Sequence, residues 1–273
     1  MKLKLKKFDL SRIADDKVVL LCARRGCGKS FIIRDILYHH RDIPIGTIIS
    51  ATEESNAFFS DFVPKSFIHY EYTADKIDNV IKRQKMIIKE KKKEIKRKGY
   101  SNIDERIVVC MDDCVYNSGF TRDNSIRNIF MNGRHFKIFY IISSQYSLSL
   151  PPVLRTNLDF IFILKENNWG NRKRLYENFG GCCPSFDIFC TLLDKCTENF
   201  ECLVIDNTSK SNKLEDIIFW FKASERKDFK LGASQFWINN NVSDSESDNE
   251  DFDPSRFTSR KKTIDFDVKK LQY

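Results

Sequence analysis

The chain has 273 residues, of which 41% are hydrophobic and 31% are charged, and its formal net charge is +8. This composition supports a sizeable core, whereas the lack of long apolar runs and of a signal-like start argues against membrane-spanning and secreted classes. The nine scattered cysteines and four dispersed histidines lack paired metal-ligand spacing, so we expect buried, reduced thiols inside a cell.

The chain begins with a polar lead-in at residues 1–16, and we predict one folded domain over residues 17–239. The domain opens with an apolar run at residues 17–22, then a glycine-rich turn, then apolar residues at helical spacing over 31–37. This strand–turn–helix order is the context that a phosphate-binding P-loop requires. We therefore predict a nucleotide-binding loop formed by Ala23, Arg24, Arg25, Gly26, Cys27, Gly28, Lys29 and Ser30.

The residue types in this turn suit a nucleoside triphosphate. Its glycines allow backbone N–H groups to close around phosphate oxygens, and the positive end of the following helix faces the same anion. Lys29 is placed to reach the β- and γ-phosphates of ATP, and the Ser30 hydroxyl is placed to ligate Mg²⁺. Ala23 stands where glycine is more usual. The alternative is a tight strand–helix turn with an incidental lysine.

A basic helix is predicted at residues 75–98, after a second strand at residues 47–51. Its apolar stripe is narrow, and residues 76–98 contain eleven lysines and arginines against Asp78, Glu90 and Glu94. Such a helix is either a solvated face or an electrostatic contact for nucleic-acid phosphates. The candidate DNA contacts are Lys82, Arg83, Lys85, Lys89, Lys92, Lys93, Lys96 and Arg97.

A buried strand predicted at residues 106–111 ends in two carboxylates, Asp112 and Asp113. In a P-loop enzyme, the first carboxylate holds the hydration shell of Mg²⁺, and the second polarises the attacking water. We assign these roles to Asp112 and Asp113 respectively. Without the P-loop, the same pattern would equally fit a turn after a core strand.

A helix at residues 124–131 precedes a long buried strand at residues 136–145, which ends in Gln145. We expect this strand between the P-loop strand and the carboxylate strand. From there Gln145 can orient the attacking water or sense the γ-phosphate, although a polar residue that merely ends a strand would look the same.

The remaining pattern alternates helices and strands, with strands at residues 158–164, 200–206 and 217–223. This alternation predicts an α/β fold with three layers and a mostly parallel, doubly wound sheet, with the site at the carboxyl ends of its strands. From residue 240 onward the composition becomes acidic and loses its hydrophobic anchors, so residues 240–273 are predicted to form a disordered acidic tail.

Together, these motifs resemble the poxvirus-type DNA-packaging ATPases of nucleocytoplasmic large DNA viruses, which belong to the FtsK–HerA superfamily. The resemblance covers residues 15–223 and rests on the order of five segments: the P-loop, Asp112-Asp113, Asn-Gly-Arg134-His, Ser-Ser-Gln145 and Pro-Pro-Val-Leu-Arg155-Thr-Asn. It implies a RecA-like sheet, hydrolysis of ATP with Mg²⁺, and a homo-oligomeric ring around double-stranded DNA. It also implies capsid or portal-vertex partners and a location at the assembly site in the host-cell cytoplasm, with possible retention in the virion.

In this family pattern, Lys29, Ser30, Asp112, Asp113 and Gln145 occupy the motif positions. A ring ATPase also needs an arginine from the neighbouring subunit to stabilise charge in the transition state. Arg134 is the first candidate for this finger and Arg155 the second. Both have structural alternatives, since Arg134 can cap the preceding helix and Arg155 can pair with Asp159.

The leading hypothesis is therefore an ATP-hydrolysing, DNA-stimulated translocase that packages the viral genome. One alternative is a small-molecule phosphotransferase resembling a nucleoside kinase, although no arginine-rich lid or acceptor pocket is recognisable. Another is a scaffold that binds nucleotide for assembly without hydrolysing it.

Overall fold

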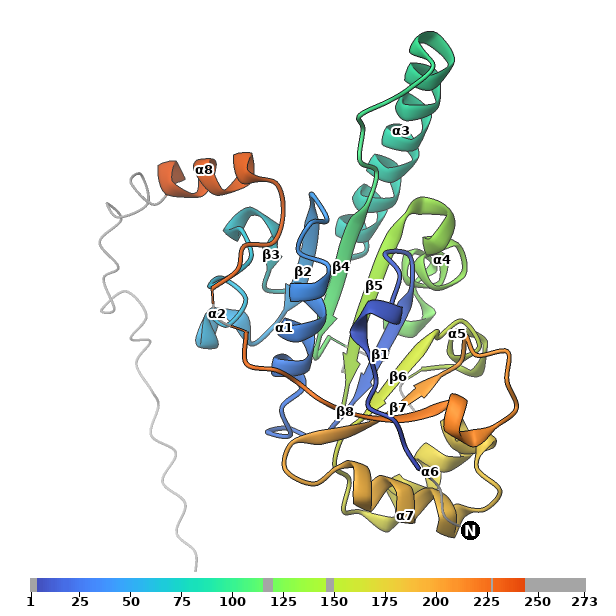
Figure 1. Ribbon diagram of the computed structural model, residues 1–273. Coiled ribbons are helices and arrows are strands. Elements are labelled where there is room, and N and C mark those ends of the chain that lie inside the picture. The colour runs from blue at the N-terminus through green and yellow to red at the C-terminus, as the bar shows by residue number, and fades with distance from the viewer. Residues whose placement is uncertain (1–3, 115–119, 146–149, 227, 244–273) are drawn as a thin grey trace, which may run out of the picture.

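The computed structural model describes residues 4–114, 120–145, 150–226 and 228–243 (Figure 1). In this part of the chain, a central sheet has the strand order β3-β2-β4-β5-β1-β6-β7-β8. Neighbours from β3 to β6 are parallel, and the β6–β7 and β7–β8 pairs are antiparallel. The strands are β1 (Val18–Cys22), β2 (Gly46–Ser50), β3 (Ile68–His69), β4 (Ile107–Asp112), β5 (Ile138–Ser144), β6 (Phe160–Ile163), β7 (Glu201–Asp206) and β8 (Ile218–Lys222). The mostly parallel sheet is confirmed, with β5 between β1 and β4 as expected.

Helices cover both faces of the sheet, which confirms the three-layer α/β fold. They are α1 (Lys29–His39), α2 (Glu53–Asn56), α3 (Ala74–Lys98), α4 (Asn124–Asn132), α5 (Pro152–Arg155), α6 (Trp169–Phe179), α7 (Phe186–Cys196) and α8 (Ser234–Ser243). The predicted acidic tail begins within α8, and its residues 244–273 lie outside the described part of the chain. No helix among the described residues is both long and apolar enough to span a membrane.

Successive side chains of the sheet point into two separate cores, as the period of a strand requires. One core packs α1 and residues 58–67 against one face, and the other packs α3, α4, α6 and α7 against the opposite face. Because strands β1, β4, β5 and β6 are buried on both faces, they read mostly as continuous apolar runs rather than as alternating patterns. That is why the sequence indicated them clearly.

The N-terminal lead-in is part of this fold rather than a polar extension. Phe8, Leu10 and Ile13 are buried in the core that contains α1. The Phe8 ring packs edge-on against Phe160 and Phe219, with centroids 5.5 and 5.6 Å apart. Charged and polar residues separate these apolar residues in sequence, and they masked the contribution of the segment to the core.

A strap formed by residues 228–238 runs from β8 across the face that carries α1 to the opposite side of the sheet (Figure 1). Its Leu231 N–H donates to the carbonyl of Phe62 at 2.9 Å, and its Phe236 packs on Phe67 with centroids 4.8 Å apart. At Gly232, φ is +86°, and a Cβ would lie 2.7 Å from the Phe67 ring. Only glycine fits there without displacing that ring.

Helix α3 confirms the basic helix predicted at residues 75–98 and begins one residue earlier, at Ala74. Its second half projects from the domain and is called the basic arm. Its buried positions, Ile77, Val80, Ile81 and Gln84, all lie in its first half. The Gln84 amide donates to two main-chain carbonyls, those of Glu105 at 2.6 Å and Phe136 at 2.7 Å. The second half extends past the amino ends of the strands and away from the body (Figure 1).

Candidate nucleotide site

The predicted P-loop lies at the carboxyl end of β1 and leads directly into α1. Gly26 and Gly28 have φ values of +78° and +93°, which side chains on L-residues rarely tolerate. Apart from Gly26 and its chain neighbours, no atom of the described residues lies within 4 Å of the position where a Cβ on Gly26 would be. Gly28 is the N-cap of α1, and within the described part of the chain no side chain forms a capping hydrogen bond at this end of the helix. The loop is therefore shaped for an anion at the helix N-terminus.

Lys29 and Asp113 form an ion pair beside this loop. The Lys29 side chain is buried, although Lys29 begins a helix next to an open cleft. The cleft has a volume of about 800 Å³, and its lining includes Gly28, Lys29, Ser30, Asp112 and Asp113. The structure thus brings four predicted chemical groups into one cleft: the lysine ammonium, the serine hydroxyl and both carboxylates.

Asp112 and Asp113 are held by one serine from the next strand. The Ser143 hydroxyl donates to the Asp112 carboxylate at 2.6 Å and accepts from the Asp113 N–H at 2.9 Å. Asp112 is buried, and burial raises the pKa of its carboxyl above the usual value. Asp113 has a φ of +53°, which turns the chain sharply after β4. A buried carboxylate with a raised pKa is poised for a cation, and its strained neighbour is typical of a functional position.

The oxygen donors suit Mg²⁺ bound together with phosphates. Among the described residues, no group of three or more histidines, cysteines or acids is arranged to hold a metal by itself. Mg²⁺ in nucleotide sites instead takes one or two protein oxygens and completes its shell with water and phosphate. The Ser30 hydroxyl and the Asp112 carboxylate, which line the same cleft, fit that requirement.

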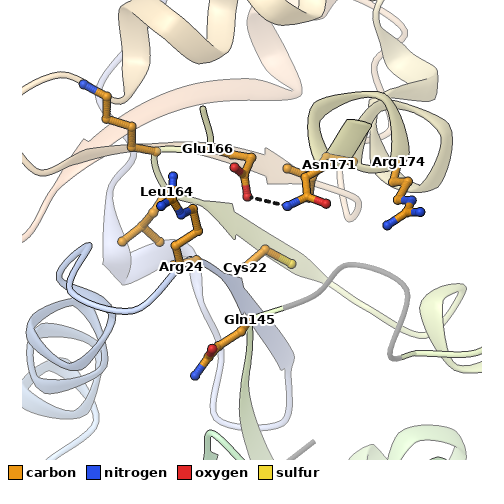
Figure 2. A pocket seen from close by; sticks show the side chains of 10 residues that line it. Cys22, Arg24, Gln145, Leu164, Glu166, Asn171 and Arg174 are labelled. Carbon is orange, nitrogen blue, oxygen red and sulfur yellow. Dashed lines mark hydrogen bonds between the residues drawn. The ribbon is translucent and has the colours of Figure 1, made fainter. Parts of the chain in front are cut away.

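Gln145 lies at the end of β5 but faces a different hollow (Figure 2). This hollow has a volume of about 160 Å³, and Cys22, Arg24 and Glu166 line it with Gln145. The Glu166 carboxylate accepts from the Asn171 amide across its wall at 3.1 Å. Gln145 is thus close to the P-loop through Arg24, but it does not line the cleft of Lys29 and Asp113. Its proposed contact with water stays a prediction.

The two arginine-finger candidates lie near the amino ends of the strands, away from the P-loop of their own subunit. Arg134 precedes β5, and its guanidinium pairs with Asp159 at 3.2 Å while its side chain remains 59% exposed. Asp159, which the sequence offered as a partner for Arg155, also accepts from the Val18 N–H at 2.9 Å. Arg155 ends α5 and is half-buried. Both finger assignments stay predictions, and either arginine would have to act on a neighbouring subunit.

Most of the candidate DNA contacts on α3 are exposed, but Arg83 is half-buried and donates to the Gln84 side chain. Burial lowers the pKa of Arg83, so it is the member of the set least suited to a phosphate contact. A shallow groove of about 510 Å³ runs along the exposed lysines beside Phe136. It is lined by Lys85, Ile88, Lys89, Lys92, Lys93, Lys96, His135 and Phe136.

Several residues of the cleft were not anticipated from the sequence. Thr52, Asn56 and Phe58 come from the segment after β2, and Phe200 and Lys222–Glu225 come from the ends of β7 and β8. Glu53 lies close enough for its charge to raise the pKa of Asp112, but its two oxygens accept from the N–H groups of Phe59 and Ser60. Glu53 therefore fixes the loop after α2.

Solved structures share this fold. The genome packaging NTPase from Sulfolobus turreted icosahedral virus 2, in complex with AMPPCP, matches with a TM-score of 0.53 and 18% identity, covering 78% of this chain and 100% of that one. EssC (ATPases 2 and 3) from Geobacillus thermodenitrificans matches with a TM-score of 0.50 and 12% identity, covering 84% of this chain and 43% of that one. Together with the cleft, these likenesses define the class: the protein has the fold of the P-loop NTPases.

Viral relatives identify the family more closely, although no protein-family model matches the chain. An uncharacterized protein of Acanthamoeba polyphaga mimivirus is 42% identical over 236 residues, covering 86% of this chain and 82% of the relative. An uncharacterized protein of Invertebrate iridescent virus 6 is 34% identical over 236 residues, covering 84% and 86%. The chain belongs to the viral protein family that these relatives represent, and its resemblance to viral packaging ATPases is confirmed at the level of the fold.

Proposed function

We propose that the protein is a DNA-translocating ATPase that packages a viral genome. The observation that carries this proposal is the convergence of Lys29, Ser30, Asp112 and Asp113 in one cleft at the mouth of the P-loop. The solved viral neighbour is a genome packaging NTPase, and the relatives are viral proteins. Together these support a motor over a metabolic enzyme.

The cleft supports hydrolysis rather than binding alone. The backbone N–H groups around Gly28 and the Lys29 ammonium bind and orient the phosphates. The Ser30 hydroxyl and Asp112 would hold Mg²⁺, which would offset the negative charge that develops on the phosphate oxygens. Once the phosphates occupy Lys29, its ion pair with Asp113 is broken, and the freed Asp113 carboxylate can accept a proton from the attacking water.

The basic arm supports the assignment of DNA as the polymer. Lys89, Lys92, Lys93 and Lys96 are exposed along the part of α3 that extends beyond the body. Dense positive charge of this kind binds phosphates without reading sequence, which a packaging motor needs because it must accept every part of a genome.

A ring is the assembly in which the arginine candidates make sense. The Lys29 cleft and Arg134 lie at opposite ends of the strands, and β5 alone spans about 20 Å between them. Arg134 would reach a phosphate only if the amino edge of one subunit faced the carboxyl edge of the next. That head-to-tail contact closes into a ring when the rotation per subunit divides a full turn.

The test is ATP hydrolysis by the full chain with and without double-stranded DNA, together with light scattering to measure the oligomer. We expect Mg²⁺-dependent phosphate release that duplex DNA stimulates in a higher oligomer. Stimulation by a nucleoside in a monomer would instead identify a phosphotransferase. Nucleotide binding without any turnover would identify an assembly scaffold. Either of these outcomes would contradict the proposal.

A further inference from the structure

The turn between α7 and β7 holds an exposed aromatic side chain in an unfavourable backbone conformation. Asn199 and Phe200 have φ values of +50° and +62°, and the Phe200 side chain is 73% exposed. Asparagine tolerates the left-handed region, but a bulky aromatic residue does so rarely and at an energetic cost. An exposed phenylalanine also gains nothing from the hydrophobic effect. Folding alone therefore does not explain Phe200 at this position.

The sheet topology places Phe200 directly on the P-loop. Because β7 runs antiparallel to β6, the start of β7 lies at the same edge as the carboxyl end of β1. The Cδ1 atom of Phe200 lies 3.6 Å from the position where a Cβ on Gly28 would be. The ring therefore lines the same cleft as Lys29 and Ser30 while keeping most of its surface open.

The segment after β8 forms a polar wall of this cleft and is fixed to the P-loop helix. The cleft is lined by Lys222, Ala223, Ser224 and Glu225. Lys222 lies opposite Glu201 where β8 runs beside β7. The Ser224 N–H donates to the buried Asp35 carboxylate of α1 at 2.7 Å. Arg226 donates to the same carboxylate at 2.6 Å. These two hydrogen bonds connect the wall to the helix that follows the P-loop.

An aromatic face beside a phosphate-binding loop, next to a fixed wall of polar groups, matches the chemistry of a nucleobase. Stacking uses the face of the base and tolerates different bases, whereas polar wall groups meet its edge. Phe31 and Phe58 also line the cleft, but their rings pack edge-on against each other with centroids 6.0 Å apart. The Phe200 ring is more exposed than that of Phe31.

We propose that Phe200 is the platform on which the base of the bound nucleoside triphosphate stacks, and that the wall at 222–225 faces the edge of that base. This inference rests on the proposed nucleotide site and adds its base-binding half. The strained turn at Asn199 and Phe200 is then maintained for ligand binding rather than for stability.

Calorimetric titration of the full chain with AMP-PNP and with tripolyphosphate, both with Mg²⁺, separates the base from the phosphates. We expect Phe200→Ala to weaken AMP-PNP binding about tenfold, the scale of one base–aromatic stack, and to leave tripolyphosphate binding unchanged. Phe200→Trp should restore AMP-PNP binding. Tyr100→Ala, which removes a similarly exposed aromatic outside the cleft, is the matched control and should change neither affinity.

A second variant guards against a purely structural effect. Phe200→Asn replaces the phenylalanine with a residue that tolerates the left-handed region. This variant should therefore raise the Tm while still weakening AMP-PNP binding. Equal losses for AMP-PNP and tripolyphosphate, or no loss for either, would overturn the stacking role. If the wild-type chain bound neither probe, the proposed nucleotide site itself would be overturned.

Discussion

Carboxyl groups at the two ends of the parallel strands have pKa values that are shifted in opposite directions. At the amino end, Asp15 bonds to His40 and Arg106, and these partners lower the pKa of its carboxyl to about 2. At the carboxyl end, burial raises the pKa of Asp112. At the amino end, protein groups compensate the charge of Asp15, whereas at the carboxyl end the buried Asp112 carboxylate would be stabilised by a cation. The comparison separates charges that stabilise the fold from charges that are held for chemistry.

The largest expected effect is at the carboxyl end. Asp113→Asn should lower ATP hydrolysis by about 10²- to 10⁴-fold, because it removes the group that accepts the proton from water, and nucleotide binding should persist. Phosphate release and AMP-PNP titration together measure the two effects. Asp187→Asn, an exposed carboxylate on α7, is the control and should retain full activity. Full turnover by Asp113→Asn would remove Asp113 from the mechanism.

The next largest effect concerns the basic arm, which extends from the amino end. Replacing Lys89, Lys92, Lys93 and Lys96 together by glutamine should weaken binding to duplex DNA by roughly a hundredfold at 0.1 M salt. The slope of log affinity against log salt should fall by about 0.9 for each phosphate that the variant no longer neutralises. Fluorescence anisotropy over a salt series measures both quantities.

A matched quadruple variant removes the same charge elsewhere. Glutamine at the exposed positions Lys173, Lys195, Lys210 and Lys213 changes the net charge equally without touching the arm. If both quadruple variants showed the same drop in affinity, α3 would be a solvated helix and the binding would reflect net charge alone.

Asp112→Asn tests the cost of holding a carboxylate for a cation. The raised pKa means that the folded state favours the protonated form of Asp112. The stability that this protonated carboxyl contributes is lost as the pH rises through that pKa. Asparagine still accepts from Ser143, and we expect the nucleotide-free Tm to rise by about 2–4 °C at pH 7 while Mg²⁺-dependent hydrolysis is lost. The gain should shrink as the pH falls. A lower Tm at pH 7 would contradict the comparison.

Asp15→Asn should give the smallest effect, with the opposite sign. Because the pKa of Asp15 is lowered, its ionised carboxylate contributes to the free energy of unfolding at pH values above the ordinary aspartate pKa. This contribution is lost as the pH falls toward about 2. About a third of the side chain is exposed, so we expect a loss below about 1 kcal/mol at pH 7. Urea unfolding at pH 7 and pH 2.5 measures it, and a loss of equal size at both values would contradict the sign.

The parallel part of the fold could be predicted because its strands are continuous apolar runs and the helices between them have clear spacing. Lys29, Asp112 and Asp113 met as expected, since the carboxyl ends of parallel strands share one edge of the sheet. Phe200 could not be predicted as part of the cleft. Its position depends on β7 returning antiparallel to β6, and hydrophobic periodicity does not encode strand direction.

Gln145 shows a second limit of prediction from sequence. Its position at a strand end between β1 and β4 was correct, but a strand end can border more than one hollow, and Gln145 lines the one with Cys22 and Glu166 rather than the cleft of Lys29. The lead-in was missed for a different reason. Three separated apolar residues among charged and polar ones give no periodic signal, although Phe8 contacts rings from two strands.

The strap at residues 228–238 has a consequence for the order of events during translation. It covers Phe62 and Phe67 on the face that carries α1, yet it is made after every strand of the sheet. A nascent chain therefore leaves Phe62 and Phe67 uncovered until residues 228–238 have left the ribosome. Completion of the domain therefore waits for these residues, and chains truncated before them would expose this aromatic face to aggregation.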